Sequence, residues 1–197
     1  MKFLKFLILI FLISCNSSSE LPDIVNGELD LKNWKLEEKG VLSIKGDWEF
    51  YWNELLYPED FSNGKVDQNK KELLYAPSIW NGKKYKGKDI PGYGYGTYRL
   101  KIYFNPEEDR YLSLYTLEQA HSYRIFINGK LRGEKGKVGK SKENFSPDYH
   151  TAIYDFTTID NSVEIIFQIS NFSHRVGGLR NDIEIGSHNK LHSYINL

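Results

Sequence analysis

The sequence has 197 residues, of which 40% are hydrophobic and 15% aromatic, enough for one domain with a single sizeable core. Its 26 Lys and Arg balance 26 Asp and Glu, which argues against nucleic-acid binding, because phosphate contacts need a clustered surplus of basic side chains. The single cysteine excludes a disulfide scaffold and any zinc site built from several cysteines. The 14 Tyr, 11 Phe and 4 Trp favour strands over helical bundles.

The N-terminus, MKFLKFLILIFLISC, is typical of a secretory signal. Two lysines precede an unbroken apolar run, 6–13, that is too short to span a membrane. Cys15 follows, before a run of Asn and Ser, in an arrangement that resembles the lipobox of bacterial lipoproteins. Ser14 is a looser variant of the usual Gly or Ala before the cysteine. The resemblance implies removal of residues 1–14 and lipidation of Cys15.

Two alternatives stay open for this segment: a buried, unreactive Cys15, or an ordinary signal peptide cut a few residues later. With lipidation, we expect a protein of the bacterial cell envelope, anchored to a membrane and facing the periplasm or the exterior. Two or more acyl chains hold a protein firmly, whereas one chain binds only marginally. The expected organisation is a signal peptide at 1–14, a lipidated polar tether at 15–27, a folded domain at 28–186 and a polar, frayed C-terminal tail at 187–197.

Short runs of alternating apolar and polar residues, separated by turn signals, predict strands along the domain. They lie at 47–52, 73–80, 97–104, 111–117, 122–128, 152–156, 163–169 and 182–185. Within the first of these strands, Trp48, Phe50 and Trp52 share one parity, which favours core positions for all three. We therefore expect an all-β fold, a jelly-roll β-sandwich of about eight strands.

Two of these strands carry the most information. The alternation is clearest over 97–104, where Arg99 and Lys101 lie on one face and the core face is apolar. The predicted core residues of this strand are Tyr98, Leu100, Ile102 and Phe104. The run at 163–169 is apolar on both faces, which predicts a central strand buried on both sides.

Three motifs in order resemble the galactose-binding-like jelly roll, in particular the sugar-binding domain of glycoside hydrolase family 2. They are the GTYRL strand at 96–100, the Asn128-Gly129 hairpin turn, and Asn171 at the end of the following long strand. The resemblance implies a β-sandwich that binds carbohydrate. It implies no catalysis, because the catalytic carboxylates of that family belong to a separate barrel domain.

A second resemblance is to the extracytoplasmic sensor domain of bacterial seven-transmembrane receptors with diverse intracellular signalling modules. It is carried by GDWEFYW at 46–52, GKVG at 136–139 and NFSHRVGGL at 171–179. Receptors of that kind continue into membrane helices, whereas this sequence ends at Leu197. We therefore expect a domain that does not signal across a membrane by itself.

The sequence offers little for catalysis or metal binding. No serine stands in a G-x-S-x-G elbow, and most acidic residues lie in loops or on outward strand positions. His188 and His192 have the spacing of a helical pair, but in a tail expected to be frayed and with no acidic residue beside them in the sequence. We therefore assign no enzyme activity, no metal and no cofactor; the ligands of a structural calcium are not identifiable.

Carbohydrate recognition needs flat aromatic faces and planar polar groups. Residues of both kinds in or near Gly-rich loops are the candidate ligand-binding residues: Trp80, Tyr93, Tyr95, Arg99, His121, His174 and Arg175. Two alternatives stay open, a core position for Trp80 and an internal carboxylate partner for Arg175. We expect any site to lie where the loops 92–96 and 171–179 meet at one end of the sandwich.

The sequence thus predicts a lipid-anchored, non-catalytic module for a carbohydrate or another small molecule, with no nucleic-acid partner. The alternative is a protein-interaction domain, or a remnant of a receptor sensor domain without its transmembrane part, acting through a membrane-protein partner.

Overall fold

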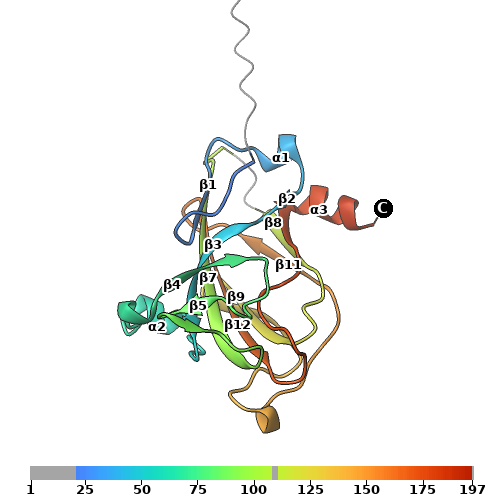
Figure 1. The fold of residues 1–197 in the computed structure, drawn as a ribbon. Coiled ribbons are helices and arrows are strands. Elements are labelled where there is room, and N and C mark those ends of the chain that lie inside the picture. The colour runs from blue at the N-terminus through green and yellow to red at the C-terminus, as the bar shows by residue number, and fades with distance from the viewer. Residues whose placement is uncertain (1–20, 108–110, 197) are drawn as a thin grey trace, which may run out of the picture.

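The computed structural model describes residues 21–107 and 111–196, so the signal peptide, Cys15 and the first part of the tether, 15–20, lie outside the described residues. The described chain forms two packed β-sheets (Figure 1). The larger sheet contains β1 (Glu28–Leu31), β3 (Gly46–Trp52), β4 (Glu72–Ala76), β7 (Gly94–Phe104), β9 (Ser122–Ile127), β10 (Lys130–Lys135) and β12 (Ser162–Asn171). The smaller sheet contains β2 (Leu42–Ser43), β8 (Tyr111–Thr116), β11 (Ala152–Thr157) and β13 (Ile183–Ser187).

The remaining elements are short. A separate hairpin consists of β5 (Lys84–Tyr85) and β6 (Lys88–Asp89). The helices are α1 (Leu36–Lys39), α2 (Pro58–Ser62) and α3 (His188–Ile195), with 3₁₀ turns η1 (Gln68–Lys70) and η2 (Lys142–Asn144). None of the helices in the described part of the chain has the length and apolarity needed to cross a membrane.

The strand order of the larger sheet is β10-β9-β12-β7-β3-β4. β7 is the longest strand and shares one edge between two partners, β3 along Gly96–Arg99 and β1 along its last four residues. β1 pairs in parallel, whereas the other pairs of this sheet are antiparallel. The smaller sheet follows the order β11-β8-β13-β2. The predicted all-β sandwich is confirmed.

The core lies between the inner faces of the two sheets. The four apolar residues predicted to point inward from 97–104 are all buried, with Phe104 the most exposed at 4%. Trp48 and Phe50 of β3 join them, as their parity indicates. β12 is buried on both faces along most of its length, which confirms the prediction of a central, two-sided strand.

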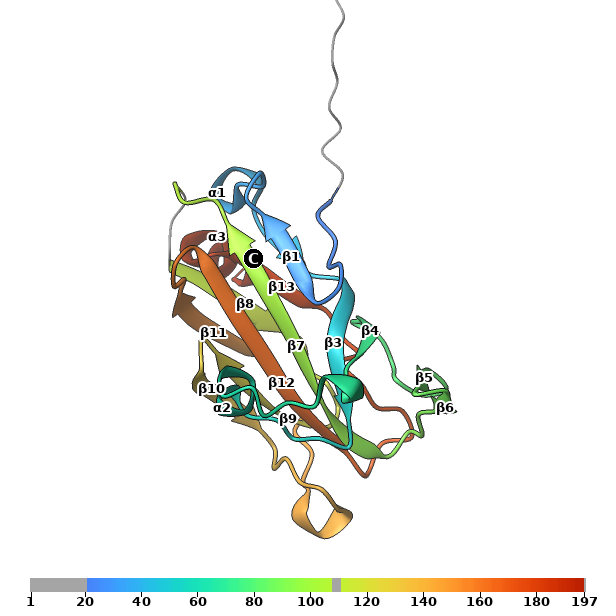
Figure 2. The same cartoon turned by 90° about the vertical axis from the view of Figure 1, so that its left-hand side faces the viewer.

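Part of the second face of β12 and β7, including Ile166, Gln168 and Thr97, is buried because the segment 53–71, including α2, crosses it (Figure 2). Thr97 of β7 donates its hydroxyl to the carbonyl of Glu54 at 2.8 Å and accepts the Leu56 amide at 2.9 Å. Gln168 of β12 donates to the carbonyl of Leu56 at 2.9 Å. The residues that follow α2, at 63–70, are exposed apart from the buried Val66.

Both ends of the described chain are more ordered than the sequence indicates. Ile24, in the expected tether, is buried, and its amide donates to the carbonyl of Lys45 beside β3. The expected polar tail, 187–197, is instead mostly helix α3, whose Leu191 is fully buried. The prediction of a frayed tail is therefore wrong.

Candidate functional site

A cleft of about 360 Å³ opens beside the C-terminal end of β3 and the β5–β6 hairpin. Its lining combines aromatic, amide and charged side chains: Trp52, Asn53, Tyr85, Lys86, Lys88, Asp89 and Ile90. Small-molecule sites have volumes of about 300–1,000 Å³ and combine apolar walls with a few polar groups. The cleft is therefore large enough for a small ligand.

The two aromatic walls of the cleft, Trp52 and Tyr85, rest on one buried ring. The ring of Phe50 lies 6.2 Å from that of Trp52 and 6.1 Å from that of Tyr85, the latter edge to face. Trp80 supports Trp52 from behind, with ring centroids 5.0 Å apart. Gly94 allows this packing, since a Cβ there would overlap the Trp52 indole. Both walls are therefore fixed by the core.

The polar groups of the cleft differ in how they are engaged. Tyr85 donates its hydroxyl to the carbonyl of Lys70 at 2.6 Å, and burial raises the pKa of Tyr85. Lys86 pairs with Glu72 at 2.9 Å. Within the described ranges, no hydrogen bond or ion pair occupies the side chains of Asn53 and Lys88, and both residues are exposed. These two side chains are free to bind a ligand.

The loops 92–96 and 171–179 meet, as expected, but no residue of either loop lines the cleft. Asn171 donates its side-chain amide to the carbonyl of Gly92 at 2.8 Å and to those of His174 and Val176 within its own loop. Asn81 donates to the carbonyl of Arg175 at 3.0 Å and accepts the amide of Gly177. Two asparagines thus lock the loops in place.

Comparison with solved structures finds glycosidases. The chain matches Bifidobacterium dentium β-glucuronidase complexed with coumarin-3-O-glucuronide with a TM-score of 0.55 and 12% identity, over 74% of this chain and 29% of that chain. A β-glucuronidase from an uncultured Clostridium gives a TM-score of 0.53, 14% identity and coverages of 74% and 28%. The Ruminococcus gnavus enzyme gives 0.51, 13% and the same coverages. The likeness is one of fold.

The chain spans less than a third of the length of these glycosidases. No family model and no curated protein matches the sequence. The fold agrees with the resemblance to the sugar-binding domain of glycoside hydrolase family 2, whose members include β-glucuronidases. The resemblance to receptor sensor domains stays a prediction.

The structure separates the seven predicted ligand-binding residues into buried and exposed groups. Trp80 and His121 are wholly buried, so neither reaches a ligand at the surface. Trp80 is a core residue, and its indole donates to the carbonyl of Gly92 at 3.2 Å. Tyr93 is 54% exposed and Arg175 is exposed, without an ion pair among the described residues. The alternative of an internal carboxylate partner for Arg175 is therefore not seen among the described residues.

Arg99 has a structural role on the outer face of the larger sheet. Its guanidinium donates to Glu164 at 2.6 Å and to Glu49 at 3.0 Å, and the ring of Phe61 covers it at 4.4 Å. Burial lowers the pKa of Arg99, but the hydrogen bonds and charges of the two carboxylates outweigh it and raise the pKa. These contacts leave Arg99 no free face for a ligand.

Tyr95 and His174 are half-buried, and Tyr95 lies within β7 rather than in a loop. His174 Nδ1 lies 3.0 Å from the carbonyl oxygen of Val176. None of the seven predicted residues lines the cleft. Trp52 was assigned to the core by its parity, and Tyr85 sits in a Lys/Gly-rich segment. An aromatic residue in such a polar segment is the signal that could have identified Tyr85.

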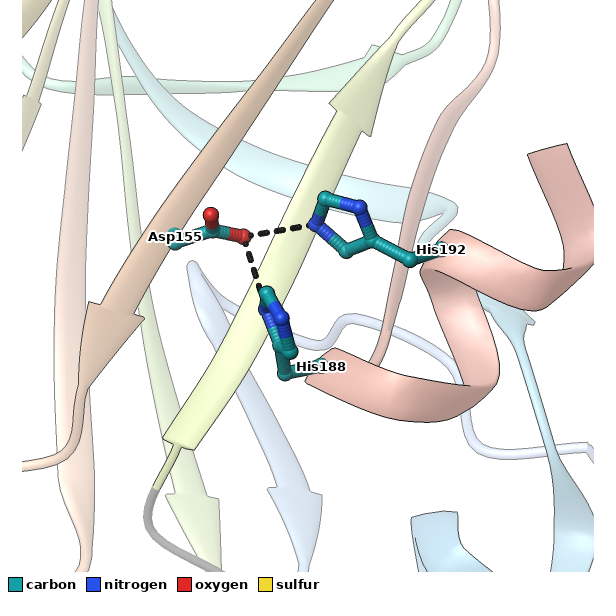
Figure 3. Close-up of side chains that lie close together, drawn as sticks. All are labelled: Asp155, His188 and His192. Carbon is teal, nitrogen blue, oxygen red and sulfur yellow. Dashed lines mark hydrogen bonds and ion pairs between the residues drawn. The ribbon is translucent and has the colours of Figure 1, made fainter. Parts of the chain in front are cut away.

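The described chain also holds one group of side chains suited to a metal. Asp155, His188 and His192 bring one ligand atom each to within 4.8 Å of one another (Figure 3). No acidic residue stands beside the two histidines in the sequence, but β11 supplies Asp155 from a distant part of the chain.

Proposed function

We propose that this protein is a non-catalytic carbohydrate-binding module that binds a sugar in the cleft beside β3. The observation that carries the proposal is the pair of aromatic walls, Trp52 and Tyr85, with the unengaged side chains of Asn53 and Lys88 at the rim. Aromatic faces stack on the apolar side of a sugar ring, and amide and ammonium groups bind its hydroxyls. The neighbouring folds belong to enzymes that act on carbohydrate, which supports this class of ligand.

The charge of the cleft favours an acidic sugar. Asp89 contributes one negative charge to the lining and pairs with Lys84 at 2.6 Å, and Lys86 pairs with Glu72 at 2.9 Å. Lys88 therefore contributes an unpaired positive charge at the rim. A uronic acid therefore gains a charge-assisted contact that a neutral hexose lacks. We expect glucuronic acid to bind more tightly than glucose.

We expect the cleft to bind its ligand without catalysis. Glycoside hydrolysis generally uses two carboxyl groups that flank the scissile bond. Asp89 is the single carboxylate among the residues that line the cleft. A ligand in this cleft is therefore expected to be held and released unchanged.

The proposal includes lipid anchoring through Cys15, which rests on the sequence. The position of the cleft suits it. Ile24 pairs with Gly46 at one end of β3, and Trp52 stands six residues further along the same strand. At about 3.3 Å per residue, the cleft lies about 20 Å from the point where the N-terminal segment meets the sheet. A tether at that end would leave the cleft accessible.

Titration of the full-length chain, kept in mild detergent, with glucuronic acid, glucose and galactose tests the proposal. Tryptophan fluorescence and calorimetry are the readouts. We expect saturable binding of glucuronic acid that Tyr85→Ala and Lys88→Ala each weaken at least tenfold. Tyr149→Ala removes an exposed aromatic residue outside the cleft and serves as the control. No binding, or equal binding by all variants, would favour the alternative of a protein-interaction domain or sensor remnant.

A further inference from the structure

A second site lies in the smaller sheet, separate from the cleft. His188 and His192 are one turn apart on α3, and Asp155 is on β11. Figure 3 shows both imidazoles directed at one carboxylate oxygen. His188 Nδ1 lies 3.2 Å from Asp155 Oδ1, and His192 Nε2 lies 3.0 Å from the same oxygen. From this geometry we propose a binding site for a divalent transition-metal ion, with Zn²⁺ as the fitting ion.

The spacing of the ligand atoms fits tetrahedral coordination. Zinc binds imidazole nitrogen and carboxylate oxygen at about 2.0–2.2 Å, so adjacent ligand atoms of a tetrahedral site lie about 3.3–3.5 Å apart. The two nitrogen–oxygen distances here are 3.2 and 3.0 Å. All three ligand atoms lie within 4.8 Å of one another, so one bound ion would also draw the two imidazole nitrogens together.

The cluster is held by the fold rather than by the ligands alone. α3 follows β13 directly, and its fully buried Leu191 fixes the helix against the sheet. Ser113 of β8 donates its hydroxyl to Asp155 Oδ1 at 2.5 Å, which orients the carboxylate. The ring of Tyr111 stacks on His188 with centroids 4.4 Å apart. Supporting contacts of this kind are typical of metal ligands.

Three polar groups of the cluster converge on one oxygen atom, as the ligands of a cation do. Two imidazoles and one hydroxyl approach the same carboxylate oxygen, and the two imidazole rings lie 4.2 Å apart. A divalent ion binds both rings in the neutral form and pairs its charge with the carboxylate.

The donor set selects the class of metal. Imidazole nitrogen suits zinc, copper, iron and nickel, whereas calcium and magnesium prefer oxygen ligands throughout. The three protein ligands leave a fourth position open, and their side chains are 28–36% exposed, so solvent or a further ligand can reach it. A bound ion would link α3 to β11 and hold the C-terminal helix on the smaller sheet.

The test is a Zn²⁺ titration of the untagged full-length chain in mild detergent, followed by calorimetry, with Co²⁺ as the spectroscopic probe. We expect one ion per chain, a tetrahedral Co²⁺ absorption spectrum and a melting temperature that rises with Zn²⁺ concentration. His192→Gln and Asp155→Asn should each weaken binding at least tenfold. Ser113→Ala, which removes only the orienting hydroxyl, should weaken it about 10–100-fold.

The matched control is a second His–Asp pair outside the cluster. His150 Nδ1 lies 2.7 Å from Asp148 Oδ1, and the His150 side chain is 82% exposed. His150→Gln should bind Zn²⁺ as tightly as the unaltered chain. Absence of one-to-one binding by the unaltered chain overturns the proposal without reference to any variant. Equal affinity of the unaltered chain and a folded His192→Gln chain would also overturn it.

Discussion

The side-chain amide of Asn171 donates a hydrogen bond to the carbonyl oxygen of Gly92, 2.8 Å away, and so joins the end of β12 to the residues before β7. These two positions are 79 residues apart in the sequence. Asn171 is fully buried and also donates to two carbonyls of its own loop. One side chain therefore holds together the loop cluster at this end of the sandwich.

Replacement of Asn171 by alanine should destabilise the protein by about 1–3 kcal/mol, because buried carbonyl groups lose their donor. The denaturation midpoint in urea measures the change. Asn63→Ala, at an exposed position after α2, should leave the midpoint nearly unchanged. If Asn171→Ala unfolds at the same urea concentration as the unaltered chain, the bond to Gly92 contributes nothing to stability.

Asn171 illustrates how much of the site could be predicted. The sequence placed 92–96 and 171–179 at one end of the sandwich, because turn signals and strand parity constrain where loops lie. Periodicity gives no information on which loop carbonyl a buried amide reaches. The cleft was missed for a related reason. Parity assigned Trp52 to the core face, but its strand ends where the core ends, so its ring is half-buried.

The C-terminal helix α3 could not be predicted from its sequence. α3 has eight residues, and only Leu191, Tyr194 and Ile195 are apolar or aromatic, too few to predict a packed helix from the sequence. Its order comes from contacts with β8 and β13, which only the tertiary structure provides. The partner of His188 and His192 is likewise 33 or more residues away in the sequence. Strands with strict alternation, by contrast, were predicted correctly, because the alternation leaves only one face of the strand apolar and able to face the core.

The register of β7 provides a direct test of that alternation. Leu100 is fully buried, so Leu100→Ala should cost about 2–5 kcal/mol through lost burial and the cavity left behind. Leu131 on β10 is 54% exposed, and Leu131→Ala should change stability by less than about 0.5 kcal/mol. Equal urea midpoints for the two variants would contradict the register.

The lipid anchor can be tested without reference to the fold. The apolar run 6–13 followed by Cys15 predicts that the mature chain begins at a lipidated cysteine. The chain produced in a bacterial host should partition into the detergent phase, and Cys15→Ser should move it to the aqueous phase. Mass spectrometry of the N-terminal peptide identifies the acyl groups. Aqueous partitioning of both proteins would exclude the anchor.

His121 should make the stability depend on pH. Burial, aided by the positive charges of Arg180 and His174, lowers its pKa in the folded protein to about 3, against about 6.5 in the unfolded chain. The unfolded state therefore binds the proton first, so the contribution of His121 to the free energy of unfolding is complete above pH 6.5 and is lost as the pH falls toward 3.

Between pH 7 and pH 5 this loss is about 2 kcal/mol. Urea denaturation of His121→Gln at pH 7 and pH 5 should show a difference in the free energy of unfolding that is smaller by that amount. The control His150→Gln, altered at an exposed histidine, should show the same difference as the unaltered chain. An identical pH dependence in His121→Gln and the unaltered chain would show that His121 is not held neutral by burial.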